Sequence, residues 1–378
     1  MIPYSHQSIS KDDVSAVLNV LTSDFLTQGP KVKEFEDALA KETGAKFVVA
    51  FSSGTAALEA AYFAAGIKRG DEVITSPLTF SATANAALWR GAKVIFVDVE
   101  EETGNLDPTE VKKRITSKTK AIVCVDYAGR PAKLRELKRL ASDCGAICIE
   151  DAAHALGATY KGKRVGGFSD ITMFSFHPVK SITTGEGGAI TTNNKALYGR
   201  LIMFREHGIT KDKSKFLRNN QGGWYYEMQE LGHNYRLTDI QAALGLSQLK
   251  RLHQFIATRR ALAQRYTRAF ARNKNLSLPA ERDGAMSSWH LYPLRLKGAC
   301  VRRRAEIFKE LRERGIGVQV HYIPVYLHPY YRKLGYKKGL CPKAEAFYEA
   351  ELSIPLFPDL KKKDQDFVIK TIQALTEL

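Results

Sequence analysis

The chain has 378 residues, of which 44% are hydrophobic and 26% charged, a composition that allows one large globular domain and a smaller one. No apolar run approaches the ~20 residues needed to cross a bilayer, and the first ten residues do not resemble a secretory signal, so we expect a cytoplasmic protein without membrane contact. The net charge of +17 is spread along the chain, with short basic clusters at 301–306 and 360–365, so we expect solvated helix faces and an anionic substrate rather than a nucleic-acid partner.

Hydrophobic periodicity alternates between helix and strand patterns from residue 52 to residue 193. Helical spacing predicts helices at 52–67, 80–92, 107–115 and 132–145. Short apolar runs predict strands at 70–77, 93–99, 120–127, 146–151, 170–176 and 187–193. This alternation predicts an α/β fold with a mostly parallel sheet covered by helices on both faces.

The pattern changes after residue 238. Residues 239–273 form one continuous helical pattern, which we interpret as a single long helix leading to a C-terminal α+β part. In that part the sequence predicts strands near 287–296 and 316–324, followed by helices. We therefore expect a large α/β domain at 1–250 and a small α+β domain at 251–378.

The polar segment 208–230 contains glycine and has no clear periodicity. A loop of this length inside a compact enzyme is often functional, so we expect it to be flexible and to serve the site.

The five cysteines are few and scattered. Cys144 and Cys148 lie four residues apart, but no second close pair completes a zinc site. We expect free thiols in a reducing compartment and no bound metal.

An acidic residue ends one of the predicted strands. Asp151 closes the apolar run that begins at residue 146. In open α/β sheets, ligands bind beyond the carboxyl ends of the strands, so Asp151 is a candidate site residue. A simple capping role in the following turn stays open.

A serine- and glycine-containing stretch opens the first of these predicted helices. The sequence SSGT follows the apolar run 47–51, and helix N-termini bind phosphate through unpaired N–H groups. Gly54 would let the backbone approach a ligand closely, and the hydroxyls of Ser52, Ser53 and Thr55 could add donors. A plain N-cap would give the same pattern.

A single lysine lies between an aromatic strand and a glycine-rich turn, in FSFHPVKSITTGEGGAI (174–190). A lysine in such a place can lose its hydration, which lowers the pKa of its amine and makes it a nucleophile toward carbonyl groups. Most lysines instead extend into solvent. The glycines after Lys180 favour the first interpretation, because they allow the backbone to pass close to a ligand.

The three features are more informative together than alone. A pyridoxal phosphate enzyme needs a lysine for the imine, an acid for the pyridine nitrogen and a cradle for the phosphate. Asp151 and Lys180 stand 29 residues apart on neighbouring predicted strand ends, downstream of the SSGT turn. Competing nucleotide motifs fail: GATYKGKR (157–164) has arginine where a P-loop needs serine or threonine, and no G-x-G-x-x-G follows the first strand.

Five segments carry a family resemblance: VVAFSSGTAALEAA, GDEVITSPLTFSATANAAL, IEDAAHALGATYKGKRVGGFSD, FSFHPVKSITTGEGGAITTN and GHNYRLTDIQAALGLSQLK. They resemble the DegT family of nucleotide-sugar aminotransferases over nearly the whole chain. VDYAG, GHNYRL and VHYIPVY are most similar to the branch that acts in the pseudaminic acid pathway, the PseC type. The resemblance implies the type I fold of pyridoxal phosphate-dependent transferases (aspartate aminotransferase-like) and a homodimer with shared active sites.

The resemblance also implies roles for individual residues. Lys180 would form the imine with the cofactor, and Asp151 would pair with its pyridinium nitrogen. The remaining cofactor contacts would be Ser53, Gly54, Thr55 and Ser175 at the phosphate, Phe80 and His154 at the ring, and Asn234 at the phosphate in the other subunit. The substrate pocket would draw on Thr27, Gln28, His177, Arg236, His321 and Tyr322. For Phe80 and His321, packing in a core stays open.

The implied reaction is transfer of an amino group from L-glutamate to C4 of a UDP-linked 4-keto-6-deoxy-N-acetylhexosamine. Other nucleotide keto-sugars, such as UDP-4-keto-arabinose or a dTDP-keto-sugar, stay open as substrates. One branch of the family dehydrates sugars with a histidine in place of the lysine, and Lys180 argues against that reaction. A binding protein without chemistry is disfavoured because Lys180, Asp151 and Ser175 are all present.

Overall fold

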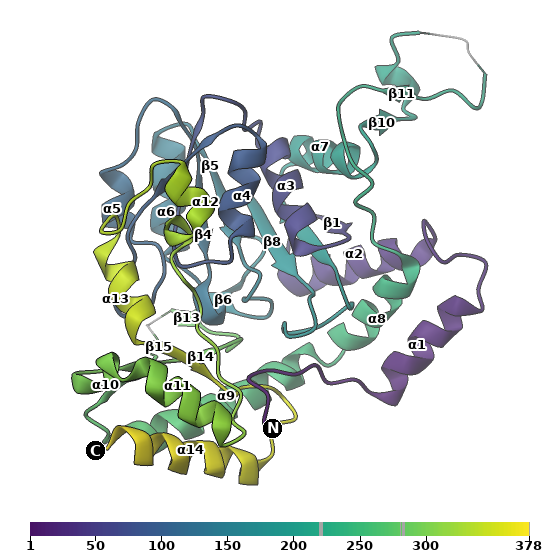
Figure 1. The fold of residues 1–378 in the computed structure, drawn as a ribbon. Helices are drawn as coiled ribbons and strands as arrows, with labels where there is room; N and C mark the ends of the chain where they lie inside the picture. The colour runs from purple at the N-terminus through teal and green to yellow at the C-terminus, as the bar shows by residue number, and fades with distance from the viewer. Residues whose placement is uncertain (219–221, 280, 282–283, 378) are drawn as a thin grey trace.

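A computed structural model describes residues 1–218, 222–279, 281 and 284–377 (Figure 1). Its largest sheet has seven strands in the order β1-β9-β8-β5-β4-β2-β3. Their bounds are β1 (Phe47–Phe51), β2 (Glu72–Thr75), β3 (Lys93–Phe96), β4 (Thr119–Val125), β5 (Ile147–Asp151), β8 (Ile171–Ser175) and β9 (Gly188–Thr192). The run β3-β2-β4-β5-β8 is parallel, and β9 pairs antiparallel with both β8 and β1. The predicted mostly parallel sheet is confirmed.

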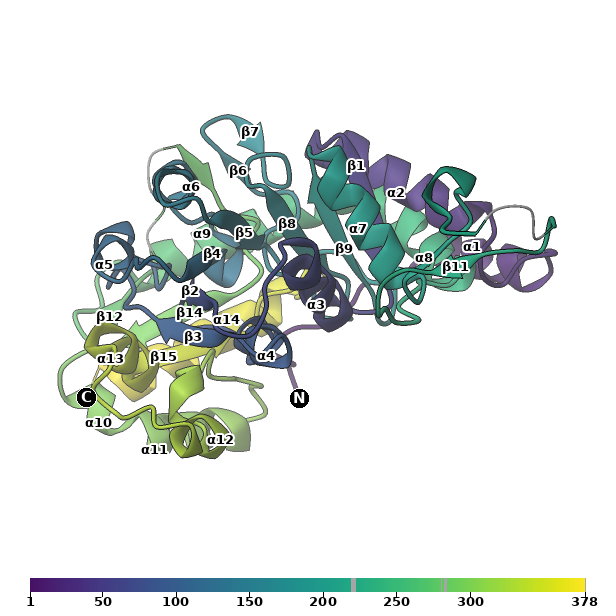
Figure 2. The ribbon, with the colours of Figure 1, turned by 90° about the horizontal axis from the view of Figure 1, so that it is seen from above.

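Helices cover both faces of this sheet, as Figure 2 shows from above. Alternate residues of β1 enter different clusters: Val49 and Phe51 pack with α3 and α7, and Val48 and Ala50 pack with α2 and α8. Strands buried on both faces are expected to be continuously apolar, as β1 is. The helices are α2 (Pro30–Thr43), α3 (Gly54–Ala64), α4 (Ala82–Trp89), α5 (Pro108–Lys112), α6 (Leu134–Asp143), α7 (Lys195–Arg205) and α8 (Asp239–Leu249). Each helix and strand predicted between residues 52 and 193 is confirmed, with shorter bounds.

The predicted single helix at 239–273 is wrong. The structure has two helices, α8 and α9 (Leu252–Phe270), separated by a turn at Lys250 and Arg251. The Arg251 side chain donates to Ser8 O at 3.1 Å and contacts the buried carboxylate of Asp13 on α1 (Lys11–Leu21). This tertiary contact accompanies the break, which lies between residues that are themselves good helix formers.

A second core lies in the C-terminal part, around a three-stranded antiparallel sheet in the order β12-β14-β15. Its elements are β12 (Leu276–Ser277), β14 (Tyr292–Leu296), α10 (Ala299–Arg302), α11 (Arg304–Glu313), β15 (Glu351–Ile354) and α14 (Lys362–Thr376). The predicted strand at 316–324 is wrong: this segment pairs only at isolated bridges, Ile2 with Ile316 and Gln319 with Ser353. Beyond Gln319 it leaves the sheet and forms a wall of the cavity described below.

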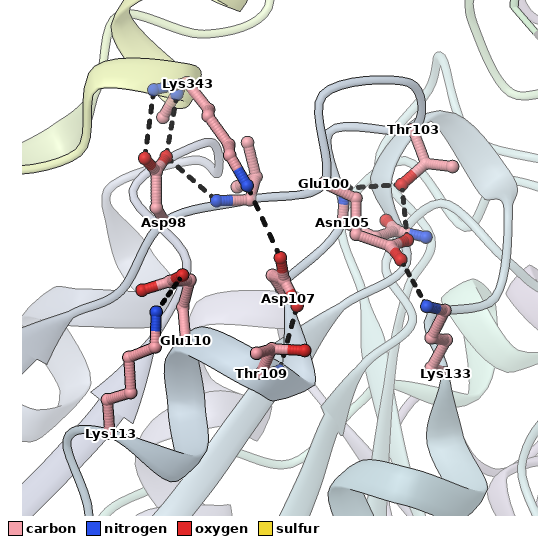
Figure 3. A network of polar contacts seen from close by, with 12 residues as sticks. Asp98, Glu100, Thr103, Asn105, Asp107, Thr109, Glu110, Lys113, Lys133 and Lys343 are labelled. Carbon is pink, nitrogen blue, oxygen red and sulfur yellow. Dashed lines mark hydrogen bonds and ion pairs between the residues drawn. The ribbon is translucent and has the colours of Figure 1, made fainter.

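The chain returns to the large sheet between residues 325 and 350. Here η3 (Val325–Leu327), α12 (Pro329–Lys333) and α13 (Pro342–Ala350) pack into the same cluster as α3 and α4. Asp98, just after β3, accepts hydrogen bonds from the backbone N–H groups of Lys343 and Ala344, both at 2.9 Å (Figure 3). The residue at the N-cap position of α13 makes no side-chain hydrogen bond to the helix. Asp98 caps the helix in its place, from a distant part of the chain. The domain boundary near residue 250 stays a prediction.

Three short pairs of strands complete the fold: β6 (Thr159–Tyr160) with β7 (Lys163–Arg164), β6 with β13 (Ala285–Met286), and β10 (Ile209–Thr210) with β11 (Glu227–Met228). The β10–β11 hairpin, with η2 (Lys213–Lys215), stands away from the body of the molecule in Figure 1. It falls in the predicted loop 208–230, of which 219–221 lie outside the described residues; the expected flexibility and role of that loop stay predictions. No helix in the described residues is long and apolar enough to cross a membrane.

Candidate active site

A cavity of about 710 Å³ lies at the carboxyl ends of the parallel strands. Val125 at the end of β4, Asp151 at the end of β5 and Ser175 at the end of β8 all line it, and residues 319–323 close it from the C-terminal part. Its volume suits a bound cofactor or small molecule, and its place is where open α/β sheets bind ligands.

Asp151 lies buried in the cavity wall. Its Oδ2 accepts a hydrogen bond from Thr83 Oγ1 at 2.6 Å, and its Oδ1 accepts one from the Ala153 N–H at 3.2 Å. Burial raises the pKa of Asp151, while these two donors and the nearby Lys180 favour its charged form. A carboxylate has about four acceptor sites, so Asp151 can receive a further N–H donor from the cavity.

Lys180 stands on the turn that follows β8, where its backbone N–H donates to His177 O at 2.9 Å. Its side chain is partly buried and lines the cavity. Desolvation lowers the pKa of Lys180 to about 8, and the Asp151 carboxylate opposes this shift. The amine is therefore available as a nucleophile close to neutral pH.

The N-terminus of α3 forms a compact cradle. Ser53 caps the helix by accepting from the Ala56 N–H at 3.1 Å, so the first-turn amides of Gly54 and Thr55 remain for an anion. A Cβ at Gly54 would lie 3.1 Å from Cβ of Ser175, and one at Gly188 would lie 2.6 Å from the backbone O of Ser53. A side chain at Gly188 would thus clash with the backbone where β9 meets the helix, and one at Gly54 would crowd Ser175 at the end of β8.

Two histidine rings and a tyrosine also line the cavity. His154 Nε2 lies 3.1 Å from the hydroxyl of Tyr322, and its ring centroid lies 4.3 Å from that of His290. Nδ1 of His154 is buried without a hydrogen-bond partner among the described residues. Burial lowers the pKa of His154 and of His290 well below the usual value, so both rings are neutral.

The structure brings most of the predicted site residues to this one cavity. Those that line it are Ser53, Gly54, Thr55, Phe80, Asp151, His154, Ser175, His177, Lys180, His321 and Tyr322. The alternative of a core position for Phe80 is excluded, because this side chain is 64% exposed at the rim. His321 is buried but faces the cavity, on irregular backbone rather than on the expected strand.

Four predicted residues lie away from the cavity of their own chain: Thr27, Gln28, Asn234 and Arg236. Thr27 forms an isolated bridge with Thr238, and Asn234 forms one with Glu206. Arg236 donates to Glu206 Oε2 at 2.9 Å. Their predicted roles therefore require a second chain.

Sequence reasoning missed several residues of the site. Thr83 lies three residues after Phe80, in one of the segments that carry the family resemblance. A hydroxyl residue shortly after a predicted strand end could have indicated its contact with Asp151. His290 and the pair Glu351 and Ser353 come from the C-terminal part and carry no local signal.

A family model described as the DegT/DnrJ/EryC1/StrS aminotransferase family matches residues 7–373. The chain belongs to this family. It is 43% identical over 380 residues to the UDP-4-amino-4,6-dideoxy-N-acetyl-beta-L-altrosamine transaminase of Campylobacter jejuni, a match that covers 100% of this chain and 98% of the relative. It is therefore a pyridoxal phosphate-dependent aminotransferase, as the sequence predicted.

Solved structures agree with this assignment. Helicobacter pylori PseC, an aminotransferase involved in the biosynthesis of pseudaminic acid, has a TM-score of 0.93 at 36% identity, covering 100% of this chain and 99% of that one. Spr1654 of Streptococcus pneumoniae, solved in a PMP form and a PLP form, reaches 0.94 and 0.93 at 33% identity, covering 100% of this chain and 99% and 98% of those chains. The predicted type I fold is confirmed.

The residues of the cavity fit pyridoxal phosphate. The unpartnered Nδ1 of His154 and the spare acceptor capacity of Asp151 are polar groups left for a ligand. The α3 N-terminus, tightened by Gly54 and Gly188, offers N–H donors to a phosphate. Lys180 supplies an amine in the same cavity.

Proposed function

We propose that this aminotransferase moves the amino group of L-glutamate to C4 of a UDP-linked 4-keto-6-deoxy-N-acetylhexosamine, giving a UDP-4-amino-4,6-dideoxy sugar for pseudaminic acid or a similar surface glycan. The observation that carries the substrate is the end-to-end match to relatives named for this amino sugar, at 39–43% identity. The chemistry is supported by Lys180 and Asp151 in one cavity.

The cofactor would be held by three groups of residues. The α3 amides of Gly54 and Thr55 with the Ser175 hydroxyl would bind its phosphate, Asp151 its ring nitrogen, and His154 and Phe80 its ring. When bound, pyridoxal phosphate supplies an electron sink next to the carbon that exchanges its proton.

Lys180 would carry the proton in both halves of the reaction. Its uncharged Nζ takes the Cα proton of glutamate, and the product 2-oxoglutarate leaves before the keto-sugar binds. In the second half Nζ returns a proton to C4 of the sugar. A donor that leaves before the acceptor binds predicts ping-pong kinetics. The positive net charge of the chain would steer a diphosphate-bearing sugar toward the cavity.

We also propose that two chains form a homodimer with shared sites. Support comes from α1, where Val14, Leu18 and Leu21 are each about half exposed along one side of the helix, followed by the exposed Phe25 and Leu26. Apolar stripes of this kind mark interaction surfaces. A partner would also be needed for Asn234 and Arg236 to reach a cofactor or substrate.

We place the reaction in the cytoplasm, which accords with the five free cysteines.

The test is a panel of UDP- and dTDP-linked keto-sugars offered with L-glutamate, the amino sugar being identified by NMR. The proposal expects amination at C4 of the UDP-4-keto-6-deoxy-N-acetylhexosamine. Amination of UDP-4-keto-arabinose or a dTDP-sugar alone would replace the substrate. Lys180→Ala should lose both turnover and the visible absorption of the lysine-bound cofactor, and an unchanged spectrum would refute the role of Lys180.

A further inference from the structure

One nitrogen of the His321 ring has a hydrogen-bond partner, and the other has none among the described residues. Its Nδ1 lies 2.8 Å from Oγ of Ser353, which sits on β15. The ring lines the cavity, and no described residue forms a hydrogen bond with Nε2. If the Ser353 hydroxyl donates to Nδ1, a neutral ring carries its proton on Nε2, which then donates into the cavity. If Nδ1–H donates to Ser353 instead, Nε2 is an acceptor.

A carboxyl group stands behind Ser353. Ser353 Oγ lies 2.5 Å from Glu351 Oε1, and the other oxygen, Oε2, accepts the backbone N–H of His321 at 2.7 Å. A backbone N–H can only donate, so Oε2 is an unprotonated oxygen. Any proton on Glu351 is therefore on Oε1, directed at Ser353.

The surroundings of Glu351 favour the neutral acid. Its side chain is fully buried, and the hydrogen-bond partners of its carboxylate within the described part of the chain, the Ser353 hydroxyl and the His321 N–H, are uncharged. Of the nearby arginines, Arg295 on β14 bonds Ser277 Oγ and Glu101 O, and Arg304 on α11 bonds Tyr348 O. Burial of a carboxylate is costly, and here it raises the pKa of Glu351 to about 8, although its contacts with Ser353 and the His321 N–H and the charge of Arg304 favour the ionised form.

The other titratable neighbours do not supply a charge to compensate. Tyr127 donates to the backbone O of His321 at 2.5 Å, and burial raises the pKa of Tyr127 and of Tyr322 far above neutrality. Burial and Lys180 lower the pKa of His321 to about 3, so its imidazole is uncharged.

We propose that Glu351 and Ser353 are positioning residues that hold His321 in one tautomer. Neutral Glu351 donates a hydrogen bond from Oε1 to Ser353, and Ser353 donates one to Nδ1 of His321. The Nε2–H of His321 then donates into the cavity, to an oxygen of the sugar substrate. An ionised Glu351 would reverse all three bonds and turn Nε2 into an acceptor. The relay thus makes His321 an uncharged donor that does not add a second positive charge beside Lys180. Only the identity of the acceptor rests on the proposed function.

The first test reads the tautomer directly. The cofactor-loaded protein is labelled with ¹⁵N-histidine, and the His321 signals are assigned by their loss in His321→Gln. The proposal expects Nε2 protonated and Nδ1 unprotonated at pH 7. Glu351→Gln should keep this tautomer, because an amide N–H can donate to Ser353 while the amide O accepts the His321 N–H. A proton on Nδ1 in the wild type, or an inverted tautomer in Glu351→Gln, would overturn the proposal.

The second test separates the two halves of the reaction. Ser353→Ala removes both hydrogen bonds of the Ser353 hydroxyl, to Glu351 and to His321, and should raise KM for the keto-sugar about two- to tenfold. The glutamate half-reaction should change less than twofold. Glu351→Gln, the conservative variant, should raise that KM less than Ser353→Ala does.

The matched control is Glu345→Gln on α13. Glu345 is a buried acid that bonds the Tyr326 hydroxyl at 2.6 Å and the Gly339 N–H at 2.7 Å, outside the cavity. An equal rise in KM in this control and in Ser353→Ala would reduce the relay to a structural role and refute the proposal. If the wild type aminates no keto-sugar, the proposed function fails, and the tautomer measurement still decides the relay.

Discussion

The availability of the Lys180 amine can be measured in the cofactor-free enzyme. Burial lowers the pKa of Lys180 from 10.5 to about 8. At pH 7.5 the uncharged fraction of the amine then rises from about one part in a thousand to about one quarter. We therefore expect the rate at which pyridoxal phosphate binds covalently to rise with pH through a midpoint near 8.

The assay follows the visible absorption of the lysine-bound cofactor after mixing, from pH 6 to pH 10.5. A free lysine analogue under the same conditions controls for the ionisations of the cofactor itself. The Asp151 carboxylate favours the charged amine, so Asp151→Asn should move the midpoint to lower pH. Asp170→Asn, whose partners are Lys138 and the Cys148 N–H, removes one negative charge elsewhere and should leave the midpoint unchanged.

Two results would contradict this reasoning. A wild-type midpoint near that of the free amine would show that the cavity stays hydrated around Lys180. A midpoint that moves to higher pH in Asp151→Asn would show that the carboxylate does not act on the amine through its charge.

Three further substitutions, the first with a control variant, test the contacts that hold the site. Asp98→Ala should lower the free energy of unfolding, measured with denaturant, by about 1 kcal/mol, because α13 loses its cap. The control Lys343→Met removes only an exposed ion pair and should lower it by less than about 0.5 kcal/mol. Equal losses in the two variants would refute the cap. Gly188→Ala should destabilise the fold by about 1–3 kcal/mol and raise the Kd for pyridoxal phosphate, and an unchanged Kd would count against the cradle. Thr83→Val should lower kcat about tenfold or more by leaving Asp151 without its hydroxyl donor, and unaltered turnover would remove that bond from the reaction.

The large sheet was predictable because its signals are local. Strands β4 and β5 are short apolar runs, one followed by an acidic residue and the other ending in one, and the helix α6 with its clear periodicity connects these two parallel strands. Asp151 and Lys180 were found for the same reason, since Asp151 ends such a strand and Lys180 lies on the turn that follows another.

The two wrong predictions have a common cause. Residues 316–320 alternate in the way that a strand would, but they form only the isolated bridges of Ile316 and Gln319. The break at Lys250 and Arg251 accompanies contacts with Ser8, some 240 residues earlier in the chain. In both places long-range contacts override a pattern that neighbouring residues define.

The relay behind His321 could not be predicted for a related reason. Glu351 and Ser353 occupy a strand in which every residue is buried, so the sequence ELSI reads as part of a core. Only pairing with the segment around Gln319 brings them to the ring, 30 and 32 residues away in the chain.

The capping of α13 by Asp98 has a consequence for protein engineering. The segment from residue 325 to residue 350 packs on the large sheet, takes its helix cap from Asp98, and ends directly at Glu351 and Ser353. A chimera that imports this segment from another aminotransferase without the residue at position 98 would leave the incoming helix uncapped at its start. Grafts intended to change sugar preference should therefore carry position 98 with residues 325–354 as one unit.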